Sequence, residues 1–466
     1  MKVLMLGWEY PPHIAGGLGT ACEGLSRALS EEGVELLFVV PRMFGDEPAS
    51  HMQLIGAADV NISAPVATVV GAPPRTAALE ARAGRSRVVE SQHESVLTLA
   101  LDCLLQPYDR PAQYVERRSV LTRRQSEIFE PGVVAPPQEQ PLLRTEQSSR
   151  VPEAGRTSHY ASDMFGEVSR YAGAVSAIAA THEFDVIHAH DWMTYPAAYA
   201  AARASGKPVV LHVHSLEYDR SGEHVNHGIN NIEREGLRAA SRIVAVSYYT
   251  KSLVSRMHGI DESRISVVHN GVSRNEGLAQ YHLEEDKTHR HVLFMGRITF
   301  QKGPEFFVRA AQKVVGHVKD VRFVMAGSGD MLDSVKALVR GLGLDAWFEF
   351  PGFLRGNERE RYFTLADVYM MPSVSEPFGI TPLEAMAFDV PVVISRQSGV
   401  SEVLRHAFKV DFWDVDRMAE LLIALLNHQP LSREMTRMAQ RELLHLHWRA
   451  AAEKMVEVYR KVAPAA

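Results

Sequence analysis

PSVSEPFGITPLEAMAF, residues Pro372–Phe388, follows the apolar run VYMM, Val368–Met371. The apolar run predicts a short buried strand, and the prolines and the glycine after it predict a loop. Thr381 is expected to cap a helix, with Pro382 at the favoured first helical position. The stretch therefore predicts a strand, a loop and a helix N-terminus, whose free N–H groups suit an anion, above all a phosphate.

Two carboxylates, Glu376 and Glu384, flank this expected anion site. Because a carboxylate repels a phosphate, both are expected to face hydroxyl groups, to which a charged acceptor makes strong hydrogen bonds. A ligand that carries both phosphates and many hydroxyls is a nucleotide sugar. The alternative is structural: Glu376 would cap a turn, and Glu384 would be a solvated residue of the helix.

The segment EPFGITPLE, residues 376–384, resembles the Glu-x7-Glu signature of retaining glycosyltransferases with the GT-B fold, especially glycosyltransferase family four and the glycogen synthases. The resemblance implies an α/β protein of two facing, doubly wound Rossmann-like domains with a cleft between them. It also implies that the ligand is the sugar donor of a transfer reaction.

Composition is that of a large soluble protein. The chain has 466 residues, which is too many for one core and predicts two domains. Its net charge of −6 gives no sign of nucleic-acid binding. With only two cysteines, the expected location is the reducing cytoplasm. No apolar run approaches the roughly 20 residues that span a bilayer, so no integral membrane segment is expected.

Buried strands and helices alternate over most of the chain, which predicts parallel sheets covered on both faces. The strands are predicted at Val3–Gly7, Leu36–Val40, Asp185–His190, Pro208–Ser215, Arg242–Ser247, Arg264–Val272, His291–Ile298, Arg322–Gly327, Trp347–Phe353 and Val390–Ser395. Helices are predicted at Thr20–Glu32, Phe165–Ala180, Pro304–Val315, Met331–Leu342 and Leu431–Val462.

The expected domains follow from this alternation. Residues 1–280 form an N-terminal, acceptor-side domain, with a partly flexible insertion at about 45–160. Residues 281–445 form a nucleotide-sugar-binding domain. Residues 446–466 form a last helix, which in the GT-B family crosses back onto the N-terminal domain; a simple surface helix fits the sequence as well.

Ligands of parallel sheets bind at the carboxyl ends of the strands, where glycines let the backbone approach closely. Gly16 and Gly17 follow the first strand, and a packing loop without a ligand is the alternative there. Arg297 and Lys302 follow a strand of the second half. The guanidinium of Arg297 can bind a phosphate through two hydrogen bonds, and the ammonium of Lys302 supplies a single positive charge. Two exposed loop cations are the alternative.

The resemblance implies roles for individual residues. Arg297 and Lys302 match the cations that hold the pyrophosphate, Glu384 the residue that binds the ribose hydroxyls, and Glu376 the residue that faces the donor sugar. His190, in HAHDW, resembles a glycogen-synthase histidine beside the reacting sugar and is expected to position the donor. Further donor contacts are expected from Asn270, Ser328, Gly329, Phe378, Gly379, Ile380 and Thr381.

Metal ligation is a rival role for His188 with His190, or His212 with His214, because positions i and i+2 of a strand share a face. No third ligand accompanies either pair in the sequence, and GT-B enzymes generally need no catalytic metal. The expectation is therefore no metal, and no cofactor other than the nucleotide sugar as co-substrate.

The motifs together predict a hexosyltransferase that moves glucose from UDP- or ADP-glucose to an α-1,4-glucan acceptor, with retention. Two departures keep the donor and acceptor open: Ile14 stands where starch synthases carry lysine, and Glu384 is present where they usually lack it. A family-four enzyme acting on a lipid-linked, polysaccharide or small-molecule acceptor is one alternative. A catalytically silent glucan-binding protein is the other.

Overall fold

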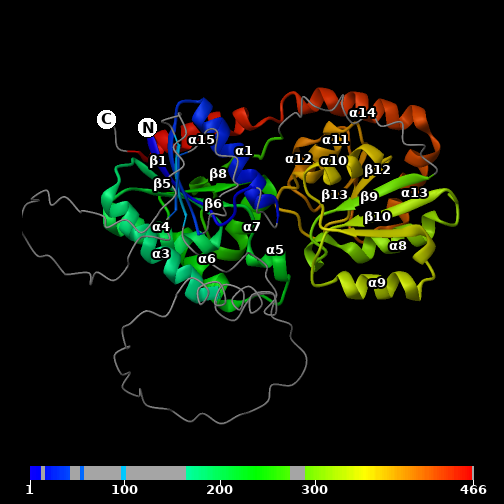
Figure 1. Ribbon diagram of the computed structural model, residues 1–466, viewed down its shortest axis with the longest axis horizontal. Helices are drawn as coiled ribbons and strands as arrows, with labels where there is room; N and C mark the ends of the chain where they lie inside the picture. The colour runs from blue at the N-terminus through cyan, green and yellow to red at the C-terminus, as the bar shows by residue number, and fades with distance from the viewer. Residues whose placement is uncertain (12–15, 42–52, 57–95, 101–163, 273–288, 464–466) are drawn as a thin grey trace, which may run out of the picture.

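The computed structural model describes residues 1–11, 16–41, 53–56, 96–100, 164–272 and 289–463 (Figure 1). Two parallel sheets organise these residues into two lobes. The order of the first sheet is β3-β4-β2-β1-β5-β6-β7-β8, and that of the second is β11-β10-β9-β12-β13-β14. This is the predicted doubly wound α/β architecture.

The first lobe contains, in chain order, β1 (Lys2–Leu6), α1 (Gly17–Glu31), β2 (Glu35–Val40), β3 (Gln53–Gly56), β4 (Val96–Ala100), α3 (Met164–Thr181), β5 (Val186–His190), α4 (Tyr195–Ser205), β6 (Val209–Val213), α5 (Glu217–Ser221), α6 (His227–Ala239), β7 (Arg242–Ala245), α7 (Tyr248–His258) and β8 (Ile265–Val267). Side chains of β1 alternate between two cores, as a strand dictates. Val3 and Met5 pack with α1 and the last helix, while Leu4 and Leu6 pack with α3 and α4.

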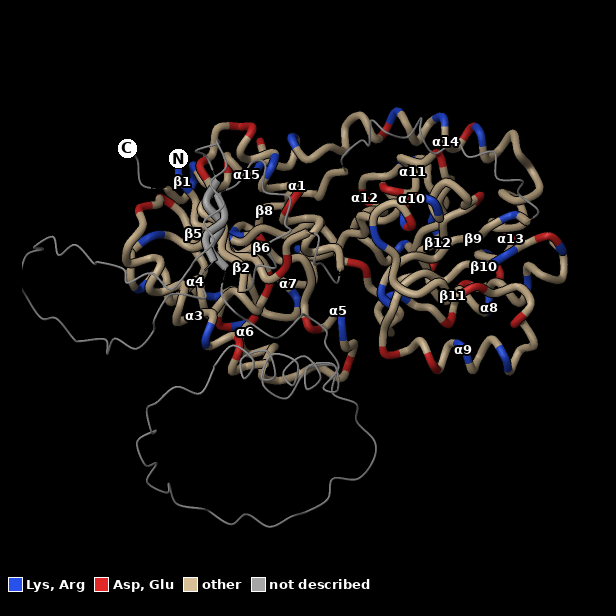
Figure 2. The backbone as a smooth tube through the Cα atoms, viewed as in Figure 1, with Lys and Arg blue, Asp and Glu red and all other residues tan. Residues whose placement is uncertain are grey.

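The second lobe contains β9 (Arg290–Met295), η5 (Phe300–Lys302), α8 (Pro304–Val314), β10 (Val321–Ala326), α9 (Leu332–Gly341), β11 (Phe348–Gly352), α10 (Gly356–Leu365), β12 (Val368–Met371), α11 (Thr381–Ala387), β13 (Val392–Ser395), α12 (Val400–Val403), β14 (Phe408–Val410), α13 (Val415–Asn427) and α14 (Gln429–Leu443). Helices α8, α9 and α13 cover one face of this sheet, and α10, α11 and α14 cover the other. Acidic and basic residues stand side by side along the outer helices α9 and α14 (Figure 2), as on solvated faces.

The last helix, α15 (Trp448–Val462), lies on the first lobe beside α1 (Figure 1). Gly24 of α1 lets the two helices approach, because a Cβ there would come within 2.1 Å of the Trp448 ring. The Tyr459 hydroxyl reaches the buried ring of His188 on β5, at 2.7 Å from its Nδ1. The chain therefore leaves the second lobe through α14 and ends on the first.

Several local expectations are wrong. The region predicted as one helix from Leu431 is two, α14 and α15, and the ring of His447 caps the second by accepting a hydrogen bond from the Ala450 amide at 3.2 Å. Thr381 is the first residue of α11 rather than its cap, and no side chain caps that helix. Helix α1 begins at Gly17, so the glycine pair stands at its N-terminus.

Two strands, β3 and β14, have no counterpart in the prediction, and β14 rather than Val390–Ser395 closes the second sheet. The sequence also predicts one ordered element at Val96–Gln106, and only Val96–Ala100 of it, strand β4, falls within the described residues. The polar composition of Asn275–Arg290 predicts an interdomain linker, of which residues 275–288 lie outside the described residues while Arg290 begins β9. Most of the insertion at 45–160 also lies outside them.

The contact between α1 and α15 can be tested with glycine substitutions. Gly24→Ala forces the Trp448 ring away and is expected to destabilise the protein by roughly 1–3 kcal/mol, the usual effect of overpacking. Gly173→Ala is the matched control, because a Cβ at this helical glycine would meet no described atom within 4 Å and alanine is the better helix former. Denaturant unfolding followed by tryptophan fluorescence measures both; equal effects would contradict the contact.

Candidate functional site

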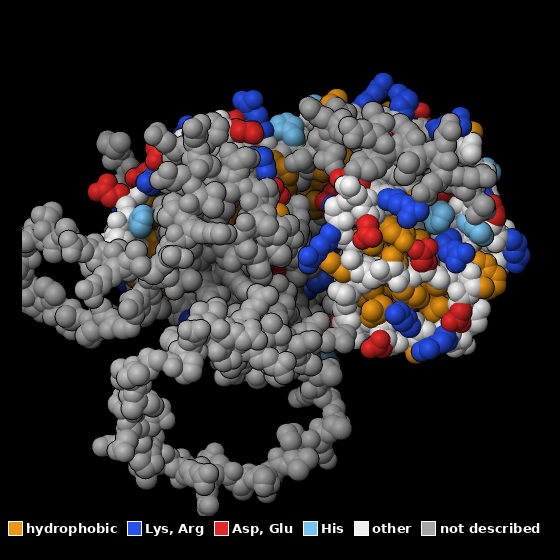
Figure 3. All heavy atoms as spheres, in the orientation of Figure 1, with side chains coloured by type: hydrophobic (Ala, Val, Ile, Leu, Met, Phe, Trp, Pro, Cys, Tyr) orange, Lys and Arg blue, Asp and Glu red, His pale blue; other side chains and the backbone are white. Residues whose placement is uncertain are grey.

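A cavity of about 410 Å³ lies between the lobes, at the carboxyl ends of strands from both sheets. This is the place where open parallel sheets bind ligands. Figure 3 shows Lys and Arg side chains along the edge of the second lobe that faces the first. Most of the predicted site residues line the cavity: Gly16, Gly17, Asn270, Arg297, Lys302, Ser328, Glu376, Phe378, Gly379, Ile380, Thr381 and Glu384.

The two predicted cations come from the loop after β9. Arg297 donates to the Gln301 side chain at 3.0 Å, and Lys302 ends the short helix η5. Gly303 follows with a φ of 63°, and a Cβ there would approach the Pro372 carbonyl oxygen to 2.2 Å. Only glycine lets this loop pack directly on the end of β12, so the cations stand over the loop that carries Glu376.

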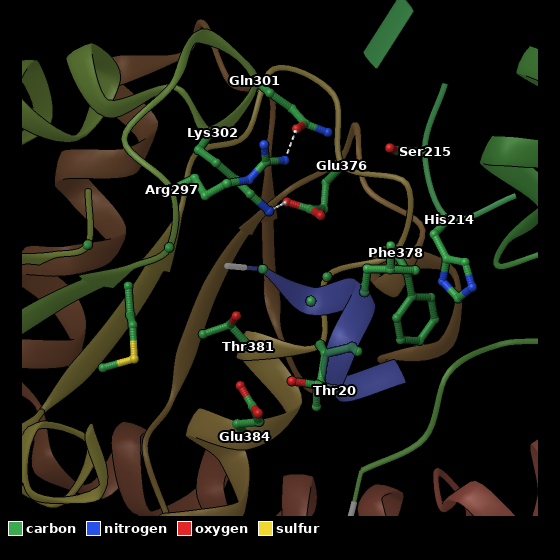
Figure 4. Close-up of a pocket in the computed structure, with 18 of the residues that line it drawn as sticks. Thr20, His214, Ser215, Arg297, Gln301, Lys302, Glu376, Phe378, Thr381 and Glu384 are labelled. Carbon is green, nitrogen blue, oxygen red and sulfur yellow. Dashed lines mark hydrogen bonds and ion pairs between the residues drawn. The ribbon is translucent and has the colours of Figure 1, made fainter. Parts of the chain in front are cut away.

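Glu376 is buried and ion-paired with Lys302, as the dashed line in Figure 4 marks. The same carboxylate oxygen accepts a hydrogen bond from the Ser373 hydroxyl at 3.1 Å. Such partners hold a buried carboxylate in one orientation. The pair therefore places one fixed negative and one fixed positive group side by side at the cavity wall.

Glu384, near the start of α11, forms an ion pair with Arg359 of α10. The neighbouring Glu384 carboxylate raises the pKa of Arg359, so the guanidinium stays charged. Arg359 also lines the cavity, and the sequence analysis missed it. The two residues are 25 positions apart on separate helices, and no local pattern links them.

The first lobe contributes polar groups that were not predicted as site residues: Glu9, Thr20, Asp191, His214 and Ser215. Asp191 has a φ of 59°, which is rare and strained for a residue with a side chain. Its Oδ1 accepts hydrogen bonds from the backbone amides of His214 at 2.7 Å and Ser215 at 3.1 Å. Burial nevertheless raises the pKa of Asp191 to about 7.

Two predicted residues do not line the cavity. His190 is fully buried behind the wall, and its Nδ1 lies 2.8 Å from Nε2 of His214, the histidine that does line it. Gly329 packs against the second lobe's own backbone, since a Cβ there would come within 2.1 Å of the Ile298 carbonyl oxygen. The motif HVHS contains His214, but the sequence suggested only a metal-binding role for this histidine and no contact with the ligand cavity.

The loop that carries Glu376 is held on both sides by the first lobe. Before it, the Ser375 hydroxyl bonds Asp219 of α5 and Tyr249 of α7, the latter at 2.8 Å. After it, the Pro377 carbonyl accepts hydrogen bonds from Ser247 at 2.6 Å and Thr250 at 3.1 Å. The position of Glu376 therefore depends on contact between the lobes.

Three family models match consecutive parts of the chain. Residues 2–122 match the starch synthase catalytic domain, residues 119–276 match glycosyltransferase family 4, and residues 280–442 match the glycosyl transferases group 1. These matches make the chain similar to glycosyltransferases, with the group 1 match confined to residues 280–442, and its fold is GT-B. The predicted fold and the prediction of a sugar-transferring enzyme are confirmed.

Relatives and solved structures of this glycosyltransferase carry several different names. An uncharacterized glycosyltransferase of Methanocaldococcus jannaschii is 27% identical over 87% of this chain and 83% of that protein. The D-inositol 3-phosphate glycosyltransferase of Mycobacterium tuberculosis is 28% identical over 64% of this chain and 67% of that protein. Sucrose-phosphate synthase from Thermosynechococcus elongatus shares the fold, with a TM-score of 0.66, 17% identity and coverage of 99% and 98% of the two chains.

HepE of Anabaena, solved with UDP and glucose, also shares the fold, with a TM-score of 0.59, 14% identity and coverage of 99% of this chain and 100% of that one. Among the described residues of the glycosyltransferase, no helix is long and apolar enough to cross a membrane.

The hydrogen bond between Ser375 and Asp219 makes the stability of the protein depend on pH. Burial raises the pKa of Asp219 from its ordinary 3.8 to about 6, although its bonds to Ser375 and Leu216 and the nearby Arg220 lower it, while Glu233 raises it. Because the pKa of this carboxyl group is raised in the folded state, the group stabilises the folded state below pH 4. This stabilisation is lost as pH rises through 6.

Asp219→Asn removes this titration. The unfolding free energy of the variant relative to wild type is therefore expected to rise by up to roughly 3 kcal/mol between pH 4 and pH 7. Unfolding curves of both proteins at several pH values measure the difference. A difference that stays constant with pH would contradict the assignment.

Proposed function

We propose that this glycosyltransferase moves glucose from UDP- or ADP-glucose to an α-1,4-glucan, with retention, in the cytoplasm. One observation carries the proposal: a single cavity combines two phosphate-suited cations, Arg297 and Lys302, with two carboxylates, Glu376 and Glu384. Diphosphate and hydroxyl groups together are the chemistry of a nucleotide sugar. HepE of Anabaena, which shares the fold, was solved with UDP-glucose.

Transfer breaks the bond between the anomeric carbon and the diphosphate, so negative charge grows on the leaving phosphate. Fixed cations stabilise that charge, and a cavity that excludes water strengthens them. Lys302 is already oriented by Glu376. A bound diphosphate would share Lys302 with this carboxylate, which leaves Glu376 facing the donor sugar beside it. Arg359 would orient Glu384 toward the ribose hydroxyls.

The acceptor-side wall favours a neutral acceptor. The described residues of the first lobe that line the cavity include two carboxylates, Glu9 and Asp191, whereas the Lys and Arg residues in the lining all come from the second lobe. A phosphate on the acceptor would meet these two carboxyl groups and no Lys or Arg among the described lining residues of the first lobe. Hydroxyl groups suit this wall, because carboxylates accept strong hydrogen bonds from them.

This wall favours a glucan, in keeping with the starch synthase match, over a phosphorylated acceptor such as the one in the name of the mycobacterial relative. A family-four reaction on another neutral, hydroxyl-rich acceptor is the second candidate, and it is supported by the match of residues 119–276. Retention is supported by the Glu-x7-Glu resemblance.

Nucleotide release distinguishes these functions. UDP and ADP are measured after incubation with UDP-glucose or ADP-glucose, with and without glycogen. Release from one donor that rises with glycogen is the expected result. Nucleotide release that is the same with and without glycogen would contradict the glucan acceptor and favour the second candidate. No release from UDP-glucose or from ADP-glucose would contradict the donor assignment.

Lys302→Ala tests the role of the cation. The expected loss is about 100-fold in kcat, or roughly 3 kcal/mol at the transition state. Lys319→Ala is the matched control, because this lysine is exposed in the turn between α8 and β10, where it bonds only the Val315 carbonyl among the contacts described. Equal rates for the two variants would show that Lys302 does not act on the leaving group.

A further inference from the structure

Four histidines lie together in the core of the first lobe, behind the cavity wall. His188 and His190 point to the same face of β5, because alternate residues of a strand share a face. His212 of β6 is paired in register with His190, and His214 follows two residues later. The face is the one that α1 and α15 cover. The two pairs that the sequence analysis weighed separately thus form one cluster.

Three of these rings are completely enclosed. His188, His190 and His212 are each at most 1% exposed. Burial lowers the pKa of His188 to about 3 and holds the pKa values of His190 and His212 well below the usual range. The three rings are therefore shielded from water, and their nitrogens can find partners only among one another and the groups packed around them.

The hydrogen bonds of the cluster leave ring nitrogens without partners. His188 bonds the Tyr459 hydroxyl through Nδ1 at 2.7 Å and faces Nδ1 of His212 through Nε2 at 3.2 Å. His190 bonds His214 through Nδ1 at 2.8 Å. Nε2 of His190 and Nε2 of His212 are buried and have no hydrogen-bond partner within the described part of the chain. Buried polar atoms without partners are uncommon and costly.

We propose that His188, His190 and His212 bind one divalent transition-metal ion, of the kind that Zn²⁺ represents. One ring nitrogen from each lies within 4.8 Å of the others. The 3.2 Å between His188 Nε2 and His212 Nδ1 matches the separation of about 3.3 Å between two nitrogens on one tetrahedral ion at ordinary Zn–N distances.

The groups around the cluster fit this role. A metal-binding histidine normally donates its other N–H to a neighbouring group, which fixes its tautomer and orientation. Tyr459 is such a partner for Nδ1 of His188, and His214 is one for Nδ1 of His190. With these N–H groups so used, Nε2 of His188 and Nε2 of His190 carry the free lone pairs that a metal requires.

The ion would act structurally. It would join β5 to β6 and, through Tyr459, would fix α15 on the first lobe. Through His190 it would also set the tautomer of His214, so that the cavity histidine accepts at Nε2 and presents Nδ1–H. The inference does not depend on the proposed donor or acceptor. Its alternative is a metal-free hydrogen-bond network, which leaves Nε2 of His190 unsatisfied. The ion would take that lone pair, whereas His212, bound through Nδ1, keeps an Nε2–H that has no partner among the described residues in either case.

Metal content and Co²⁺ spectroscopy of the full chain, purified without a histidine tag, test the proposal. The protein is isolated from zinc-supplemented cells and also refolded with Zn²⁺ or Co²⁺. The expected result is one ion per chain, with the visible absorption of tetrahedral nitrogen-bound Co²⁺. No stoichiometric ion by either route would overturn the proposal and would leave glycosyl transfer untouched.

Substitutions locate the ion. His212→Asn is expected to lose the stoichiometric metal, while His224→Asn, at an exposed histidine of the same lobe, retains it. Tyr459→Phe keeps all three ligands, and its expected effect is a 10- to 100-fold weaker affinity in chelator competition. It also keeps the test decisive if His212→Asn fails to fold. Unchanged affinity in Tyr459→Phe, or full metal content in His212→Asn, would refute the site.

Discussion

The carbonyl group of Pro377 joins the two lobes through buried hydrogen bonds that position the loop carrying Glu376. It belongs to the second lobe and accepts hydrogen bonds from Ser247 and Thr250, both fully buried at the start of α7 in the first lobe. The approach is close enough that a Cβ on the neighbouring Gly399 would come within 2.4 Å of the Ser247 side chain. Separating the lobes would break these bonds and release the loop that carries Glu376, so the geometry of this carboxylate and the closure of the cavity are coupled.

Charge is divided between the lobes in a way that matches a transfer reaction. The second lobe lines the cavity with cations and paired carboxylates, and the first lobe lines it with Glu9, Asp191 and uncharged polar groups. One wall therefore suits a diphosphate and the other suits hydroxyls. The anomeric carbon of a donor would lie where the two walls meet, beside Glu376.

The sequence predicted what depends on neighbouring residues. The strand, loop and helix around Glu376 were predicted because apolar runs, prolines and glycines act locally, and the cations after β9 followed from the same logic. Partners far apart in the chain were not found: Arg359 with Glu384, Asp219 with Ser375, and Tyr459 with His188. Gly329 was taken for a ligand contact because a glycine needed for backbone packing looks the same in sequence.

The account rests on the cavity being the place where a nucleotide binds, and hydrogen–deuterium exchange tests this most directly. Exchange is compared without ligand and with saturating UDP or ADP. The account predicts that one of the two nucleotides slows exchange in residues 296–303, 327–329 and 376–384, which come together around the cavity. Protection confined to other segments, or none with either nucleotide, would contradict it.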